Sequence, residues 1–171
     1  MLEKFKQITT FVFDVDGVLT DGSVLVLPDG LMVRNMNIKD GYALQLAVKK
    51  GYNVLVISGG TSAEVKERLA KLGVTHTWMQ VTDKAATLQS FINKEGIDTS
   101  EVLYMGDDIP DLSVMRLAGL PCCPQDAVQE IREIALYISH IPGGKGCARD
   151  VIEKVMKLRG DWLEDTTVKS Q

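Results

Sequence analysis

Short runs of apolar residues alternate along the chain with longer stretches in which apolar residues recur every three or four positions. The short runs are typical of buried strands, and the longer stretches are typical of amphipathic helices that end at a glycine. The strand candidates are residues 8–15, 53–57, 77–81, 102–105 and 120–123. The helix candidates are residues 41–50, 62–72, 84–94, 108–118, 126–135 and 148–158. This alternation predicts an α/β fold: a three-layer, Rossmann-like, doubly wound parallel sheet with helices on both faces.

One segment interrupts the alternation directly after the first strand. Residues 23–37 are apolar or β-favouring on either side of Pro28-Asp29-Gly30, and an Asp-Gly pair between two such runs predicts a β-hairpin. The hairpin is too short to be a domain of its own. We therefore predict a single domain over residues 1–160, followed by a polar tail at residues 161–171 that frays.

Composition narrows the class of protein. The chain has 171 residues, of which 45% are hydrophobic, and this suits one compact domain. The net charge of −4 gives no basic surface for nucleic acid. No apolar run approaches the ~18 residues of a membrane span, and no signal peptide precedes the first strand, so we expect a cytoplasmic protein. The three cysteines are expected to be buried thiols.

Polar side chains stand where each predicted strand ends. Functional groups gather at this edge of a parallel sheet, because the loops there are free to vary. Two neighbouring carboxylates repel unless a cation lies between them, and an all-oxygen ligand set favours magnesium over zinc. Each residue alone could be a turn, a helix cap or a surface charge, but their coincidence at successive strand ends favours a functional site. The residues are Asp14, Asp16, Ser58, Lys84, Asp107 and Asp108.

These residues resemble the four motifs of the haloacid dehalogenase superfamily, in order and over nearly the whole chain. Residues 11–20, FVFDVDGVLT, resemble the first motif, DxDGxxT. Ser58 resembles the second motif, Lys84 the third, and residues 106–111, GDDIPD, the fourth. With aspartate at both positions of the first motif, the resemblance implies a phosphatase.

The resemblance also implies a role for each residue. Asp14 is expected to attack phosphorus and form an aspartyl phosphate, while Asp16 acts as general acid and then as general base. Ser58 and Lys84 are expected to hold the phosphoryl oxygens. Magnesium is expected to bind the Asp14 carboxylate, the Asp16 main-chain carbonyl and Asp107. The remaining acidic residues of the fourth motif, Asp108 and Asp111, are expected to support the loop and orient Lys84.

Most members of the superfamily carry a cap domain that closes over the substrate, and this chain has no room for one. The hairpin resembles that of the 3-deoxy-D-manno-octulosonate 8-phosphate phosphatases, which are tetramers in which it projects to a neighbouring subunit. The resemblance implies a homo-oligomer, most simply a tetramer with the hairpin at the interface. It further implies a small-molecule substrate, a sugar-acid phosphate of lipopolysaccharide precursor synthesis.

Further matches to these phosphatases lie outside the four motifs: residues 37–41, NIKDG, Arg68, and the loop 143–146, GGKG. A phosphorylated keto acid also carries a carboxylate, so a cation beyond Lys84 is expected near the sugar. Three simpler interpretations stay open: an Arg68–Glu64 surface pair, a helix start at 37–41, and an ordinary flexible loop at 143–146. The candidate substrate-binding residues are Asn37, Asp40, Gly41, Gly59, Gly60, Arg68 and Lys71.

The second motif departs from the related enzymes at one position. Many of them have Thr-Gly-Arg, whereas this chain has Ser58-Gly59-Gly60. The hydroxyl is kept, but the basic side chain is lost, and this leaves a nine-carbon 2-keto-3-deoxy acid 9-phosphate open as the alternative substrate. A non-catalytic interaction protein is the other alternative, but such a protein would be expected to have lost at least one of the motif residues retained here.

Overall fold

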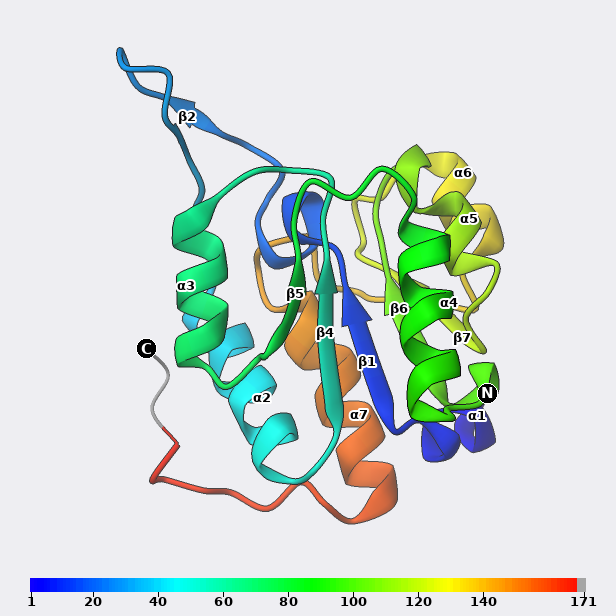
Figure 1. The fold of residues 1–171 in the computed structure, drawn as a ribbon. Coiled ribbons are helices and arrows are strands. Elements are labelled where there is room, and N and C mark those ends of the chain that lie inside the picture. Colours follow the sequence, from blue (N-terminus) through cyan, green and yellow to red (C-terminus); the bar gives the residue numbers. More distant parts are fainter. Residues whose placement is uncertain (169–171) are drawn as a thin grey trace.

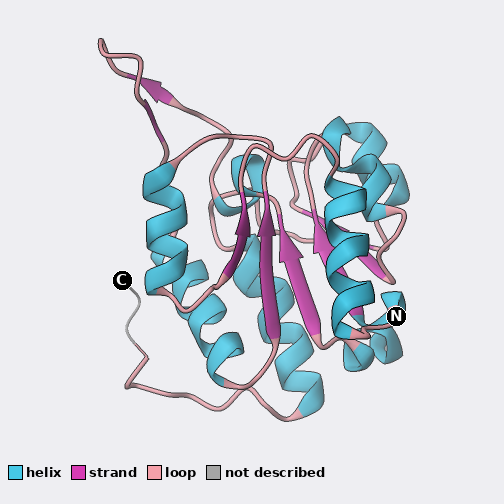
Figure 2. Ribbon diagram, in the orientation of Figure 1, coloured by secondary structure: helices cyan, strands magenta, loops and turns pink. Residues whose placement is uncertain are grey.

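The computed structural model describes residues 1–168 of the chain. Six parallel strands form one sheet in the order β5-β4-β1-β6-β7-β8. Figure 1 shows β5, β4, β1 and β6 side by side, and Figure 2 shows the same view coloured by secondary structure. Phe13 pairs with both Val56 and Met105, so the central strands end at the same level. The strands are β1 Thr10–Phe13, β4 Asn53–Ile57, β5 His76–Trp78, β6 Val102–Met105, β7 Leu120–Cys123 and β8 Tyr137–Ile138.

Helices cover both faces of the sheet. The helices α1, α2, α3 and α7 share one apolar core with Phe11 and Phe13 of β1, whereas α4, α5 and α6 share the other core with Val12. Successive strand residues thus serve opposite faces, which confirms the predicted doubly wound α/β fold. Within residues 1–168, every helix is too short or too polar to cross a membrane. The helices are α1 Leu2–Gln7, α2 Ile38–Lys49, α3 Ala63–Lys71, α4 Lys84–Glu95, α5 Leu112–Met115, α6 Gln129–Ile134 and α7 Cys147–Arg159.

The predicted hairpin is present between β1 and α2. Its antiparallel strands, β2 Leu25–Val26 and β3 Met32–Val33, are short, and Gly30 has φ +84° at the turn. Figure 1 shows the hairpin projecting away from the sheet. No cap domain is present among residues 1–168, so the edge of the sheet where the strands end is open.

Several boundaries differ from those that periodicity predicts. The helix expected at 108–118 is a 3₁₀ turn, Ile109–Asp111, with Pro110 in it, followed by the short α5. The helix expected at 41–50 begins earlier, where the Asn37 side chain accepts a hydrogen bond from Lys39 N. Neither α1 nor β8 is predicted, because β8 has only two residues and α1 buries only Phe5.

The tail expected to fray packs against the body of the protein as far as residue 168. Trp162 lies edge-on to Tyr42, with ring centroids 6.1 Å apart. The Tyr52 hydroxyl donates a hydrogen bond of 2.5 Å to Asp161, and Lys49 pairs with Asp165 at 2.5 Å. These contacts, made with α2 and the residue before β4, hold a segment that has no helix or strand of its own. The rest of the expected tail lies outside the described residues.

Candidate active site

A cleft of about 370 Å³ opens where β1, β4 and β6 end. It lies at the edge of the sheet where the motif residues were expected to gather. All six strand-end residues named from the sequence line it, together with both glycines that follow Ser58. The lining residues are Asp14, Asp16, Gly22, Ser58, Gly59, Gly60, Val81, Thr82, Lys84, Asp107, Asp108 and Pro110.

The turn after β1 brings Asp14 and Asp16 to the same cleft. One oxygen of Asp14 accepts a hydrogen bond of 2.6 Å from the next backbone amide, which fixes the carboxylate at the strand end. Gly17 then reverses the chain with φ +82°. The buried hydroxyl of Thr20 accepts hydrogen bonds from the amides of Gly17 and Gly22, at 3.4 and 3.2 Å. The last residue of the DxDGxxT motif therefore closes the turn that its first residues open.

Lys84, the first residue of α4, connects this turn to the loop after β6. Its Nζ lies 2.7 Å from Asp14 Oδ2 and 2.7 Å from Asp111 Oδ1, and its side chain is only 5% exposed. Tyr104 donates a hydrogen bond to the same Asp111 oxygen, while the Asp107 amide donates to the other. Burial opposes the charge on Lys84, but Asp14 and Asp111 together raise its pKa. The predicted support of Lys84 by Asp111 fits this geometry.

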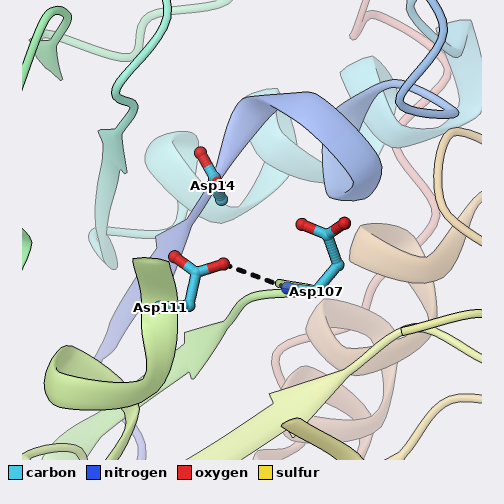
Figure 3. A group of neighbouring side chains, drawn as sticks. All are labelled: Asp14, Asp107 and Asp111. Carbon is cyan, nitrogen blue, oxygen red and sulfur yellow. Dashed lines mark hydrogen bonds between the residues drawn. The ribbon is translucent and has the colours of Figure 1, made fainter. Parts of the chain in front are cut away.

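Three carboxylates lie close together here, and two of them pair with Lys84. Figure 3 shows Asp14, Asp107 and Asp111, which can each offer an oxygen within 4.8 Å of the others. Burial, and then the neighbouring Asp111, raise the pKa of Asp14 to about 6 and that of Asp107 to about 8. Asp107 Oδ1 is buried and has no hydrogen-bond partner. One buried oxygen thus lacks a hydrogen-bond donor, and the group holds more carboxylates than cations. Both features fit a binding site for a hard divalent cation such as Mg²⁺.

Ser58 directly follows β4 and is 1% exposed. Its amide donates to the Trp78 carbonyl at 2.9 Å, and its carbonyl accepts from the Val81 amide at 3.0 Å. These bonds tie the second motif to the segment that leads to Lys84. The Ser58 hydroxyl accepts a hydrogen bond from the Gly60 amide at 3.1 Å, so it faces the cleft from a fixed position.

The glycine-rich loop at residues 143–146 packs behind the first turn. A Cβ on Gly143 would lie 1.9 Å from the Gly17 carbonyl oxygen, and the Gly144 amide donates to Val18 O at 2.9 Å. The loop is therefore held in place, which excludes the interpretation as an ordinary flexible loop. Asn37 also contacts it, donating from Nδ2 to Gly144 O at 3.2 Å.

Five of the seven candidate substrate-binding residues lie outside the cleft. Asn37 caps α2, and Asp40 is 2% exposed and accepts a hydrogen bond of 2.7 Å from the Arg149 amide at the start of α7. Lys71 pairs with Glu67 on the exposed surface of α3. The sequence suggested a helix start as the alternative for residues 37–41, and the caps fit it. A substrate role for these residues remains a prediction.

Arg68 lies in a second cavity, of about 270 Å³, between the hairpin and α3. Its Nη2 is buried without a hydrogen-bond partner, close to Gly41, where a Cβ would lie 3.1 Å away. Gly41 thus leaves space for the guanidinium. The alternative of an Arg68–Glu64 ion pair has no support in the ion pairs of the described chain.

Three residues of the site were not named from the sequence. Arg34 pairs with Asp16 from the base of the hairpin, Tyr104 donates to Asp111, and Thr20 closes the first turn. Thr20 could have been found, since it belongs to the first motif. Tyr104 lies inside an apolar strand and Arg34 follows a hairpin, and nothing in the local sequence distinguishes either from an ordinary residue at such a position.

The fold and the four strand-end motifs define a haloacid dehalogenase-like phosphatase, and comparison with known proteins agrees. Residues 79–146 match the family model of the haloacid dehalogenase-like hydrolases. The chain is 31% identical, over 94% of its length and 85% of the relative, to the 3-deoxy-D-manno-octulosonate 8-phosphate phosphatase KdsC of Salmonella typhi. It belongs to the KdsC family of phosphatases.

Solved structures of the same family share the whole architecture. The phosphatase of Yersinia pestis superposes with a TM-score of 0.91 at 27% identity, over 94% of this chain and 86% of the other. The phosphatase of Moraxella catarrhalis, in complex with a magnesium ion, a phosphate ion and a KDO molecule, gives a TM-score of 0.90 at 33% identity, over 94% and 92%. A relative with this fold therefore binds magnesium, phosphate and the sugar acid together.

The buried carboxyl group of Asp40, in the first turn of α2, gives a testable prediction about the stability of the protein. Burial raises its pKa to about 6, although the Arg149 amide opposes the shift. The folded state therefore binds the proton more tightly than the unfolded state, so the stability contributed at low pH is lost as the pH rises through about 6. We expect Asp40→Asn to raise the free energy of unfolding by on the order of 2 kcal/mol at pH 7.5, and by less at pH 5.

The control is Asp150→Asn, which should have the opposite sign. Burial again opposes the charge there, but hydrogen bonds from Lys154, Tyr137 and Ser139 lower the pKa of Asp150. That variant should lose stability at pH 7.5. Urea unfolding at both pH values, with saturating magnesium, measures the differences. Equal effects of the two substitutions would contradict the assignment of Asp40 as a carboxylate whose burial outweighs its hydrogen bond.

Proposed function

We propose that the protein hydrolyses 3-deoxy-D-manno-octulosonate 8-phosphate to the free keto acid and phosphate. The observation that carries the proposal is the cleft in which Asp14, Asp16, Ser58 and Lys84 meet, in a chain that shares 31% identity with phosphatases named for this substrate over 94% of its length. The open edge of the sheet leaves room for a phosphorylated sugar acid, because no cap domain among residues 1–168 restricts access to it.

The reaction divides into two steps. In the first, an Asp14 oxygen bonds to phosphorus, the bond from phosphorus to the sugar oxygen breaks, and Asp16 gives a proton to that oxygen. In the second, water attacks the aspartyl phosphate, Asp16 takes a proton from the water, and the carboxylate of Asp14 is released. The Ser58 hydroxyl and Lys84 Nζ hold phosphoryl oxygens during both steps, and Lys84 offsets their charge.

We assign the metal to the Asp14 carboxylate, the Asp107 carboxylate and the Asp16 carbonyl. Asp111 is the less suitable ligand, because its two oxygens already accept three hydrogen bonds, from Lys84, Tyr104 and the Asp107 amide. Asp107 Oδ1 has no such partner and is available. When bound, magnesium supplies positive charge between the nucleophile and the phosphate.

The substrate is tested by comparing two keto-acid phosphates. We expect kcat/KM for the eight-carbon 8-phosphate to exceed that for the nine-carbon 9-phosphate by at least about tenfold, the discrimination that one added carbon supports. Phosphate release measures both rates. Asp14→Asn should reduce release to background while circular dichroism shows an intact fold. Preference for the nine-carbon acid would replace the proposed substrate. A folded protein that hydrolyses neither keto-acid phosphate nor p-nitrophenyl phosphate would favour the non-catalytic alternative.

The metal is tested by removal. Chelation should abolish hydrolysis and added Mg²⁺ should restore it. Asp107→Asn should weaken magnesium affinity by at least about tenfold, measured by calorimetry, because a ligand that was a charged oxygen becomes neutral. Asp98→Asn serves as the matched control, because Asp98 caps the turn before β6, at the opposite end of that strand from Asp107. Activity that survives exhaustive chelation would refute the metal assignment.

The hairpin supports a further proposal, a homo-oligomer with the hairpin at the interface, for which a tetramer is the specific expectation. Six of its apolar residues are at least 40% exposed, and four of these lie on the two paired strands. The residues are Val24 40%, Leu25 64%, Val26 63%, Leu31 42%, Met32 51% and Val33 41%. A surface of this kind is suited to burial against a second copy of the chain.

We therefore expect the wild-type protein to sediment as a tetramer, and the double variant Leu25→Asp, Met32→Asp to sediment as a smaller species, because charges would be buried at the contact. The control is Leu2→Asp, since Leu2 is 63% exposed on α1, and α1 lies far from the hairpin in Figure 1. A wild-type monomer with full activity would contradict the proposal.

A further inference from the structure

A guanidinium from the base of the hairpin clamps the second aspartate of the first motif. Arg34 Nε lies 2.6 Å from Asp16 Oδ1 and Nη2 lies 3.2 Å from Oδ2, so both carboxylate oxygens are held by one planar fork. The Arg34 side chain is 7% exposed and that of Asp16 is 36% exposed. Such a two-point pair fixes the orientation of a carboxylate as well as its charge.

The backbone and its neighbours hold the guanidinium in turn. Arg34 Nη1 donates a hydrogen bond of 3.2 Å to the Met32 carbonyl, and Glu64 of α3 adds a favourable charge. Glu64 is itself held by the Ser62 hydroxyl at 3.0 Å. Arg34 is therefore part of an ordered path from β3 to the cleft.

Gly60 provides the space for this pair. A Cβ at that position would lie 2.9 Å from Asp16 Oδ2 and 3.2 Å from Arg34 Nη2. The second motif of many related enzymes has an arginine there, and a side chain of any size would displace the pair. This chain has a glycine at position 60 instead, and the guanidinium of Arg34 lies in the space beside it.

We propose that Arg34 is a positioning residue for Asp16, which it aims at the leaving oxygen of the substrate. The inference rests on the proposed phosphatase mechanism. A carboxylate offers about four lone-pair sites, and Arg34 uses two of them, so the others remain for proton transfer. The proton that Asp16 gives to the sugar oxygen is restored when the same group accepts one from the attacking water. Arg34 neither gains nor loses a proton.

The test compares two kinds of leaving group. An aryl oxide is stable enough to leave without being protonated, whereas an alkyl oxide needs a proton from a general acid. Three substrates are compared by kcat/KM, which reports only steps up to the loss of the leaving group: the eight-carbon keto-acid phosphate, ribose 5-phosphate and p-nitrophenyl phosphate. Arg34→Gln should lower kcat/KM about tenfold for both alkyl phosphates and less than about threefold for the aryl phosphate, since general acid catalysis is worth ~10²–10⁴ and positioning supplies part of it.

Two further variants keep the result interpretable. Arg34→Lys keeps the charge but cannot hold both oxygens, so it should restore part of the alkyl rate. Gly60→Ala keeps both charged groups and displaces them, and should show the same selective loss as Arg34→Gln. Arg116→Gln is the matched control, because Arg116 is an exposed arginine just after α5. It should change none of the three rates.

Each contrary pattern has a definite meaning. A loss confined to the keto-acid phosphate would make Arg34 a carboxylate-binding residue and overturn the positioning role. An equal loss on all three substrates, or no loss on any, would overturn it as well. Failure of the proposed substrate is visible separately, because the wild-type protein would then hydrolyse the other two phosphates and not the keto-acid phosphate.

Discussion

One buried ammonium group, Lys84 Nζ, determines how the charges of the site balance. It lies 2.7 Å from an oxygen of Asp14 and 2.7 Å from an oxygen of Asp111, in a position that is 5% exposed. Burying a carboxylate removes its hydration and costs on the order of several kcal/mol unless a cation compensates its charge. Asp107 is a third carboxylate without such a partner, and its pKa rises to about 8. The site therefore lacks positive charge, and an affinity for a divalent cation follows from that deficit.

Close backbone contacts keep these carboxylates together. A Cβ on Gly17 would lie 1.9 Å from Asp107 Oδ2, and one on Gly106 would lie 2.4 Å from the Asp111 side chain. A Cβ on Gly143 would lie 1.9 Å from the Gly17 carbonyl oxygen. Three segments far apart in the sequence thus meet where only glycine fits. Because the carboxylates are held by backbone packing and not by a mobile cap, the site is organised before any ligand arrives.

The residues that could be named from the sequence are those whose signal is local. Asp14, Ser58 and Asp107 each stand directly after or close behind an apolar strand, and strands of one parallel sheet end at one edge. The Arg34–Asp16 pair joins residues eighteen positions apart and depends on the path of the chain out of the hairpin. Asp40 resembles an ordinary acidic residue in the first turn of a helix, and only the packing of α2 on α7 makes it a buried cap.

The hairpin contributes an exposed apolar surface and, through Arg34 at its base, a contact with Asp16 in the cleft. Its apolar strands are exposed, and an isolated two-stranded hairpin is at best marginally stable in water. Its conformation therefore depends on what covers those strands. Arg34 directly follows β3, so the path of the last hairpin strand sets where the guanidinium meets Asp16. In the proposed oligomer, a subunit that covers the hairpin would also hold the strand that leads to Arg34, so assembly and the orientation of Asp16 would depend on the same few residues.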